Sequence, residues 1–244
     1  SVDGYHRGGG GVSGGTIESA FTMKNYKTNY SIGHPFLLNS KDFIEKQNKE
    51  ASKDTFKIKY IDSIKSWSAP FVMSIANTRV VRRSVELHEL NQSGYGSDFT
   101  YKEFMNVKKY STALMVSIGL AILGLMIVSP ISSLFRKLFT KPGNGPDKKT
   151  RDNGWFESIF IGKNTNNEFY KLRIYGDGDP GYKTTAKFIC ESALCLVKSD
   201  GYLENTNKGG VLTTATGLGD HLIKRLKNAD ILFEGPEKIA KTTT

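Results

Sequence analysis

Cysteine and histidine are scarce in this sequence. Its 244 residues include two cysteines, Cys190 and Cys195, and four histidines. The cysteines are five positions apart in an expected helix, a spacing that places them on different faces. We therefore expect two reduced thiols in a reducing compartment. Scattered histidines without a cysteine pair at ligand spacing also predict that the chain has no metal site.

The sequence also lacks a nucleic-acid-binding pattern, although it is basic. Lysine and arginine outnumber aspartate and glutamate by 34 to 24, which gives a net charge of +10. A surplus of this size suits an anionic surface, either a membrane or a nucleic acid. The cations are scattered and do not interleave with aromatic residues as RNA- and DNA-binding segments do. We therefore expect a membrane surface, and no nucleic acid, as the partner.

Charge is absent from one long stretch, residues 110–135. At about 1.5 Å per residue, the part before Pro130 would form a helix of roughly 28 Å, close to the hydrocarbon thickness of a bilayer. Lysines and arginines flank both ends, where lipid phosphates would lie. The residues expected to meet lipid or a helix within it are Ala113, Ser117, Ala121 and Leu125. The first three recur every four positions, a small-residue stripe that lets helices approach closely.

The alternative is an unusually apolar core helix of a soluble domain, but core helices normally keep one polar stripe. We favour membrane contact, and this divides the chain into three parts. Residues 1–109 and 141–244 would be the first and second parts of a mixed α+β domain, and 110–140 the membrane-associated segment. Pro130 and the amphipathic residues after it suit a helix that lies along the interface.

A glycine-rich run opens the chain. Gly9, Gly11 and Gly14 fit the pattern G-x-G-x-x-G of dinucleotide-binding turns. That pattern is meaningful only when a strand precedes it and an acidic residue ends the next strand about twenty positions later. Few residues precede this run, and a loop is expected near position 35. We therefore interpret the run as a flexible or ligand-lining loop, with Thr16 as the cap of a short helix.

Periodicity predicts an α+β fold for the rest. Alternation indicates strands at 56–61, 155–161 and 169–175, the last two as a hairpin, and a final strand at 231–233. Helical spacing indicates helices at 73–85 and 219–228. Another helix should bury the stripe Phe188, Ile189, Ala193, Leu194 and Val197. We expect 41–53 to be solvated, 99–107 to lead into the apolar stretch, and the tail after Pro236 to be frayed.

Two groups of polar residues are candidates for function. Arg79, Arg82 and Arg83 lie close together on the first long helix and could bind a phosphate or carboxylate bidentately. They could equally form a solvated face paired with Glu86 and Glu89. His221 could donate a proton, although a lone histidine in a helix is more often structural.

Three blocks of the sequence resemble a known family. They are SAPFVMSIANTRVVRRS, GDPGYKTTAKFICESALCLV and GGVLTTATGLGDHLIKRLKNADILF. Together they are similar to the carboxy-terminal half of the saccharopine dehydrogenase-like oxidoreductases, which include trans-acting enoyl reductases. The resemblance implies a Rossmann domain that binds NAD(P) and precedes this segment. That domain is absent here, so we expect no cofactor to bind to this segment alone.

The resemblance also implies the place of several residues. The turn residues Gly11, Ser13, Gly14, Gly15 and Thr16 match a family pattern expected to face the cleft between the two domains. In this interpretation Arg79, Arg82 and Arg83 contact the substrate or an interdomain phosphate. Tyr182 and Thr213 would line the cleft.

Two functions follow as hypotheses. The first is part of a membrane-anchored NAD(P)-dependent oxidoreductase acting on a lipid-derived substrate, and the second is an inactive scaffold or subunit of a membrane complex. The expected partners are membrane lipid, the amino-terminal nucleotide-binding domain and a homo-oligomer or membrane complex. Mitochondrial and lipid-droplet membranes both fit. If strands on either side of residues 110–140 share one sheet, the segment should enter and leave the same face of the bilayer.

Overall fold

One mixed sheet of seven strands forms the body of the protein. The computed structural model describes residues 1–10, 14–23, 33–90, 94–96, 98–136, 143–198 and 210–240. The sheet order is β2-β3-β4-β1-β5-β6-β7. The strands are β1 (Val2–Gly9), β2 (Lys59–Ile61), β3 (Ser66–Pro70), β4 (Tyr101–Val107), β5 (Trp155–Lys163), β6 (Phe169–Asp177) and β7 (Leu232–Ile239). The central β1 is parallel to β4 and antiparallel to β5, and the other neighbours are antiparallel. The predicted α+β class is confirmed.

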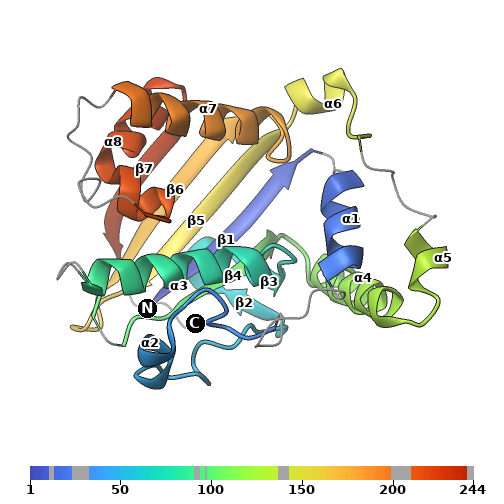
Figure 1. Ribbon diagram of the computed structural model, residues 1–244, viewed down its shortest axis with the longest axis horizontal. Coiled ribbons are helices and arrows are strands. Elements are labelled where there is room, and N and C mark those ends of the chain that lie inside the picture. The colour runs from blue at the N-terminus through green and yellow to red at the C-terminus, as the bar shows by residue number, and fades with distance from the viewer. Residues whose placement is uncertain are drawn as a thin grey trace.

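Helices cover one face of the sheet and one end of it (Figure 1). The helices are α1 (Gly14–Met23), α2 (Lys41–Glu45), α3 (Ser74–Leu90), α4 (Tyr110–Val128), α5 (Ser132–Arg136), α6 (Lys148–Asp152), α7 (Lys183–Lys198) and α8 (Thr214–Asn228). Figure 1 shows α3, α7 and α8 on the same face, with α1, α4 and α5 gathered at one end. Strands that precede and follow α4 in the sequence pair in this one sheet, because β1 lies between β4 and β5.

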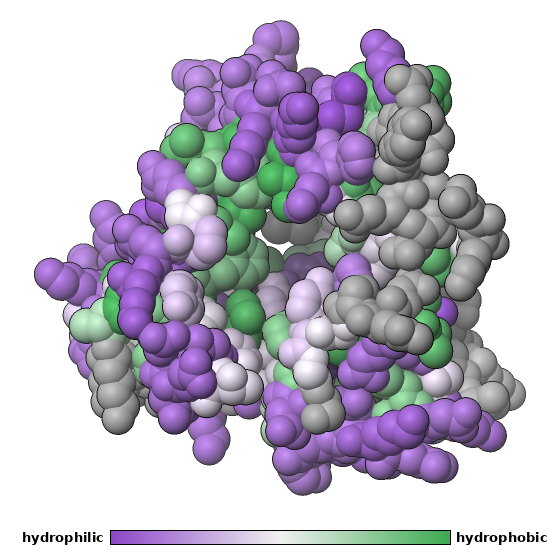
Figure 2. All heavy atoms as spheres, turned by 90° about the vertical axis from the view of Figure 1, so that its left-hand side faces the viewer, coloured by the Kyte–Doolittle hydropathy of each residue, from purple (hydrophilic) through white to green (hydrophobic). Residues whose placement is uncertain are grey.

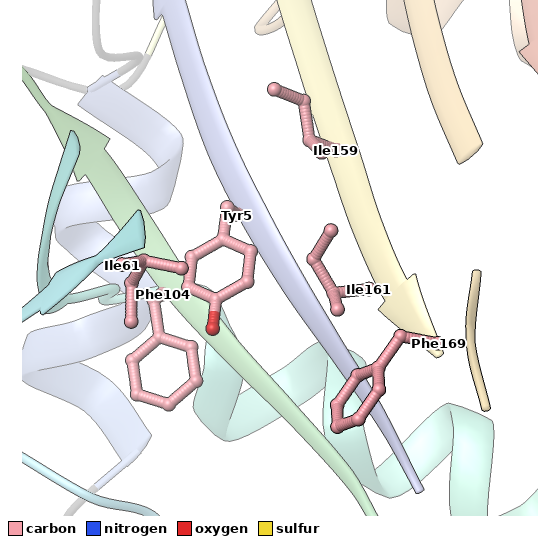
Figure 3. Packing of buried hydrophobic residues seen from close by; sticks show 6 residues of the cluster. All are labelled: Tyr5, Ile61, Phe104, Ile159, Ile161 and Phe169. Carbon is pink, nitrogen blue, oxygen red and sulfur yellow. The ribbon is translucent and has the colours of Figure 1, made fainter. Parts of the chain in front are cut away.

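The opposite face carries the main apolar cluster. Its buried members come from five strands and are Tyr5, Ile61, Phe104, Ile159, Ile161 and Phe169 (Figure 3). The rings of Tyr5 and Phe104 stack with centroids 5.4 Å apart. Side chains alternate between the two faces of a strand, so Ser158 and Phe160, the neighbours of Ile159 on β5, point towards the helices. Both faces of β5 therefore carry apolar side chains.

The hairpin predicted at 155–175 is confirmed, and the strand after it is longer than expected. β5 and β6 pair antiparallel from Trp155 with Asp177 to Lys163 with Phe169. The prediction of a frayed tail after Pro236 is wrong for residues 237–239, since Ile239 pairs with Phe169 on β6, and residues 241–244 lie outside the described residues. The register shifts near Gly235 and Pro236, and this irregularity hides the strand in the sequence.

Other predicted boundaries were also wrong. The glycine-rich start is the strand β1, 99–107 contains β4, and 66–70 is the strand β3. Residues 41–53 are not merely solvated, because Phe43 and Ile44 of α2 are buried in a cluster with Phe36 and Val85 of α3. The strand expected at 56–61 is reduced to β2, and α8 begins five residues earlier than predicted, at Thr214.

The predicted buried stripe of α7 is largely exposed. Ile189 and Val197 are 64% and 80% exposed, whereas Thr184 and Cys195 are buried. α7 packs on α8 through this mixed side, with Cys195 against Leu218. The side of α7 that packs on the protein is therefore set by its contact with α8, and it is not the most apolar side of the helix. Neither cysteine forms a disulfide, and Cys190 is exposed whereas Cys195 is buried.

The apolar helix α4 packs on the sheet at its start and is exposed beyond it. Ala113 is fully buried, and Tyr110 contacts Trp67 of β3 edge to face at 5.0 Å. Farther along, Leu125 is 69% exposed. Among the described residues, α4 has the length and the composition to cross a membrane. Inside the protein, 6% of its apolar stretch is buried.

Candidate functional site

The arginines of α3 lie at the contact between this helix and the loop 33–54. Arg79 binds the carboxylate of Asp54, with Nη1 2.6 and 2.9 Å from its two oxygens, and donates to the carbonyl of Gly33 at 2.9 Å. Arg82 donates to the carbonyls of Pro35 and Ser52, both at 2.7 Å. Both side chains are buried, so their donors are occupied inside the protein.

The environment of Arg82 is apolar as well as polar. Its guanidinium stacks over the ring of Phe36 at 5.5 Å. Burial lowers the pKa of Arg82 to about 10, and the nearby charge of Arg79 acts in the same direction. Arg83 differs from these two, because its side chain is 30% exposed and pairs with Glu86 at 2.7 Å. Substrate contact by the three arginines stays a prediction. At Arg79 and Arg82 a substrate would have to displace the carboxylate and carbonyl groups that these side chains already bind.

Thr213 and Tyr182 lie at the starts of two different helices. Thr213 caps α8 through a reciprocal pair of bonds with Thr216, and its hydroxyl lies 2.7 Å from that of Ser84 on α3. Tyr182 lies in the turn before α7, where its backbone N–H donates to Asp179 at 3.1 Å. The structure thus joins Thr213 to the arginine-bearing helix and places Tyr182 beside the loop at Asn144.

The glycine-rich run joins β1 to α1. Gly11 and Ser13 lie outside the described residues. Gly14 begins α1 and donates its N–H to the carbonyl of Asn144 at 3.1 Å. Gly15 and Thr16 belong to the first turn of α1, so the prediction that Thr16 caps this helix is wrong.

A strand therefore does precede the glycine run, contrary to our expectation, but the rest of a dinucleotide site is not found in the described residues. β1 lies beside the antiparallel β5, not in a doubly wound parallel sheet. Among the described residues, the element after α1 is the short helix α2, not a strand that ends in an acidic residue. The described residues therefore do not fit a complete dinucleotide site.

The strongest candidate site is a groove between α8 and the helix-covered face of the sheet. Its volume is about 740 Å³, within the range of ligand pockets. The sheet side is formed by Phe156, Ser158, Phe160, Leu172, Ile174 and Phe233, and the α8 side includes Ala215, Leu222, Ile223 and Leu226. Figure 2 views the left-hand side of Figure 1 and shows a hollow with hydrophobic side chains along one part of its border and hydrophilic ones along another. This groove, called the α8 groove below, suits an apolar chain.

Glycine shapes the helical side of the α8 groove. Gly219 has φ 47° and ψ −134° inside α8, a conformation that residues with a Cβ rarely adopt. The helix changes course there, and Gly219 itself lines the groove. The lining also includes four ionisable residues outside the sheet, His88, Tyr95, Asp220 and Lys227. His221, the proton donor considered from the sequence, is exposed on α8 and is not among the lining residues.

A polar group closes the floor of the α8 groove. Nδ1 of His6 on β1 lies 2.9 Å from the hydroxyl of Ser158, and Nε2 lies 3.8 Å from Glu103 on β4. Glu103 accepts hydrogen bonds from Tyr101 at 2.8 Å and from Asn77 of α3 at 2.9 Å. Burial lowers the pKa of His6 to about 4, so its ring is neutral near pH 7.

Sequence reasoning did not identify this polar group. Burial raises the pKa of Glu103, and the hydrogen bonds from Tyr101 and Asn77 oppose that shift. His6, Glu103 and Ser158 come from three strands that the sheet brings side by side. The sequence offered one signal, the polar Ser158 between Phe156 and Phe160 on an otherwise apolar strand face.

Several curated proteins are similar to this chain. A Mycobacterium tuberculosis protein whose name includes the words trans-acting enoyl reductase is 35% identical over 176 residues, covering 69% of this chain and 41% of the relative. The trans-acting enoyl reductases of Mycobacterium bovis and Mycobacterium ulcerans are 31% and 30% identical, covering 68% of this chain and 40% of each relative. The chain thus spans about two fifths of the length of these relatives. No family model and no solved structure matches it. The similarity supports an oxidoreductase-like family.

Proposed function

We propose that this chain is the substrate-binding part of a reductase that acts on an apolar, acyl-bearing substrate. The observation that carries the proposal is the α8 groove, which is apolar along the sheet and of a size that accepts a lipid acyl chain. The similarity to proteins named trans-acting enoyl reductase supplies the reaction class. An enoyl group is a carbon–carbon double bond conjugated to a carbonyl, and it is often carried on an acyl chain.

The proposal includes a nicotinamide cofactor. The described residues do not fit a complete dinucleotide site, so we place NAD(P) in a domain that would precede this chain, as the resemblance to saccharopine dehydrogenase-like proteins implies. The cofactor would supply hydride. The role of this chain would be to bind the acyl substrate, exclude water and present the reacting end.

Membrane association forms the third part. α4 exposes apolar side chains over most of its length, including Met115 at 73% and Val128 at 71%. Exposing this much apolar surface to water is costly, and a lipid interface removes the cost. Because β1 pairs with both β4 and β5, a single crossing by α4 would separate strands of one sheet. A helix that enters one leaflet and returns satisfies both observations. Docking there would shorten the path of a poorly soluble substrate.

The test is nucleotide and substrate binding by the natural protein that contains this chain. Titration with NADPH and with NADH, followed by nicotinamide fluorescence, should show saturable binding of one or both. Addition of a long-chain enoyl thioester should then oxidise the bound nucleotide. The groove variant Ala215→Trp fills the site from an exposed position of α8 and should raise KM for the thioester while nucleotide binding stays unchanged. Failure to bind either nucleotide would support the scaffold alternative.

A further inference from the structure

We propose that Ser158 binds the carbonyl oxygen of an acyl chain held in the α8 groove, and that His6 is the positioning residue that orients the Ser158 hydroxyl. This inference rests on the proposed function and names the ligand group that its site recognises. The class of ligand is a long acyl ester or thioester with an uncharged carbonyl.

The floor of the α8 groove singles out Ser158. Of the sheet residues that line the groove, Ser158 is the one with a hydroxyl, and the others are apolar or glycine. Phe156 and Phe160 flank it on the same face of β5, and Ile174 lies opposite it on β6. A carbonyl that enters this groove with its acyl chain loses water, so it must find a donor on the protein. Ser158 is the donor that the sheet floor provides.

His6 determines what the Ser158 hydroxyl can do. Its ring is held between two aromatic rings, stacked on Phe71 at 5.1 Å and edge-on to Phe160 at 5.7 Å. A neutral imidazole carries one N–H. On Nδ1 this N–H donates to Ser158 at 2.9 Å, whereas on Nε2 it would face Glu103 at 3.8 Å, too far for a hydrogen bond, and would be buried without a hydrogen-bond partner among the described residues.

The tautomer with the proton on Nδ1 is therefore the favoured one. Ser158 then accepts from His6 through Oγ, and its own proton is free to point into the groove. The contacts of the described residues give that proton no other acceptor than the His6 ring itself. The hydroxyl is thus oriented as a donor before any ligand binds.

The charges around Ser158 favour an uncharged carbonyl. The His6 ring is neutral near pH 7, because burial lowers its pKa to about 4. The nearest ionisable group behind it, Glu103, is an acid and offers no positive charge. A free carboxylate would need a cation at this point of the floor, and the groove's lysine, Lys227, lies on α8 instead. An ester or thioester carbonyl needs only the one donor.

The experiment measures how radiolabelled ligands partition at equilibrium between the full-length protein and detergent micelles. The probes are methyl hexadecanoate, which has the carbonyl, hexadecane, which lacks it, and hexadecanoate, which is charged. Ser158→Ala and His6→Phe are compared with Ser192→Ala, a matched loss of a half-buried hydroxyl on α7 that does not line the groove. Ala215→Trp separates groove binding from uptake by α4, and thermal unfolding checks that each variant folds.

The expected result is that Ser158→Ala weakens binding of the ester about fivefold and changes binding of the alkane by less than twofold, as loss of one hydrogen bond predicts. His6→Phe should act in the same direction, and Ser192→Ala should change nothing. An unchanged preference for ester over alkane in Ser158→Ala, with binding still abolished by Ala215→Trp, overturns the carbonyl site and leaves the proposed function standing. If Ala215→Trp has no effect on either probe, the groove is not the binding site and both proposals fall.

Discussion

The ring of Tyr110 lies edge-on against that of Trp67, with centroids 5.0 Å apart, and so attaches the first turn of α4 to strand β3. Ala113, one turn later, is fully buried against the same part of the sheet. The apolar helix therefore starts from a rigid position and projects its remaining side chains outward. This arrangement makes the proposed contact with lipid open to direct tests.

Leu125→Asp should weaken binding to vesicles. Leu125 is 69% exposed on α4, and an aspartate in hydrocarbon costs about 3 kcal/mol more than leucine, more than a hundredfold in affinity. Leu90→Asp is the matched control, because Leu90 is 72% exposed at the end of α3, away from α4. Co-sedimentation with vesicles of mixed neutral and anionic lipid measures both. Equal loss in the two variants would count against α4 as the lipid-binding element.

Segments on the two sides of α4 should be accessible from the same side of a sealed vesicle. Cys190 is naturally exposed after α4, and Lys49→Cys supplies a probe at an exposed position before it. A membrane-impermeant maleimide should label both thiols from the outside to the same extent, because β1 pairs with strands from both segments. Labelling of one thiol only until detergent is added would show that the helix crosses the bilayer once.

Arg82→Met should destabilise the protein strongly, and Arg83→Met should not. Removing the Arg82 guanidinium leaves the buried carbonyls of Pro35 and Ser52 without their donor, at a cost of about 3 kcal/mol. Arg83 is partly exposed and pairs only with Glu86 among the described residues, so its loss should cost about 0.5 kcal/mol. Urea unfolding monitored by circular dichroism separates them. If Arg82→Met kept full stability and lost substrate binding, the role predicted from the sequence would be the better one.

His6 should make stability depend on pH between about 6.5 and 4. Its pKa is lowered to about 4 by burial, so in this window the unfolded state binds a proton that the folded state refuses. Stability is therefore full above pH 6.5 and is lost as the pH falls, by on the order of 3 kcal/mol at pH 4. The difference between the wild type and His6→Phe in urea midpoints at pH 7 and pH 5 isolates this contribution. Glu103, whose raised pKa acts with the opposite sign, is present in both proteins. Parallel pH curves would refute the assignment.

Two glycines should respond in opposite ways to alanine. A Cβ at Gly154 would lie 2.5 Å from the backbone of Asp179, so Gly154→Ala must move the turn before α7 and should cost about 2 kcal/mol or more. At Gly124 in α4 a Cβ meets nothing within 4 Å, so alanine should stabilise that helix by up to about 1 kcal/mol. Thermal unfolding of both variants in the same detergent provides the comparison. A stable Gly154→Ala variant would show that the turn is more adaptable than its packing suggests.

The parts of the fold that could be predicted are those where local pattern and tertiary role agree. β5 and β6 alternate clearly, and α3 and α4 have the spacing or length of helices. β1 was missed because five of its eight residues are glycines or charged, and its position in the centre of the sheet overrides that weak preference. The α7 stripe failed for a related reason, since periodicity identifies an apolar side but not the neighbour that a helix will choose.

The candidate site was less accessible to sequence reasoning. The pair His6 and Ser158 is separated by 152 positions, and only the register of β1 on β5 brings them together. The three arginines were recognised as a group, but the pattern could not show that the loop 33–54 wraps around α3 and occupies two of them. Buried polar contacts of this kind depend on long-range pairing, which a one-residue shift in register would abolish.

The position of β1 in the middle of the sheet has a consequence for synthesis on the ribosome. β1 emerges well before its neighbour β5, which leaves the exit tunnel only after the whole of α4. Until then the nascent chain exposes an apolar helix and an incomplete sheet in which one edge of β1 is unpaired. Intermediates of this kind tend to aggregate. Early capture of that helix, by lipid or by a chaperone, would protect the chain until β5 completes the sheet.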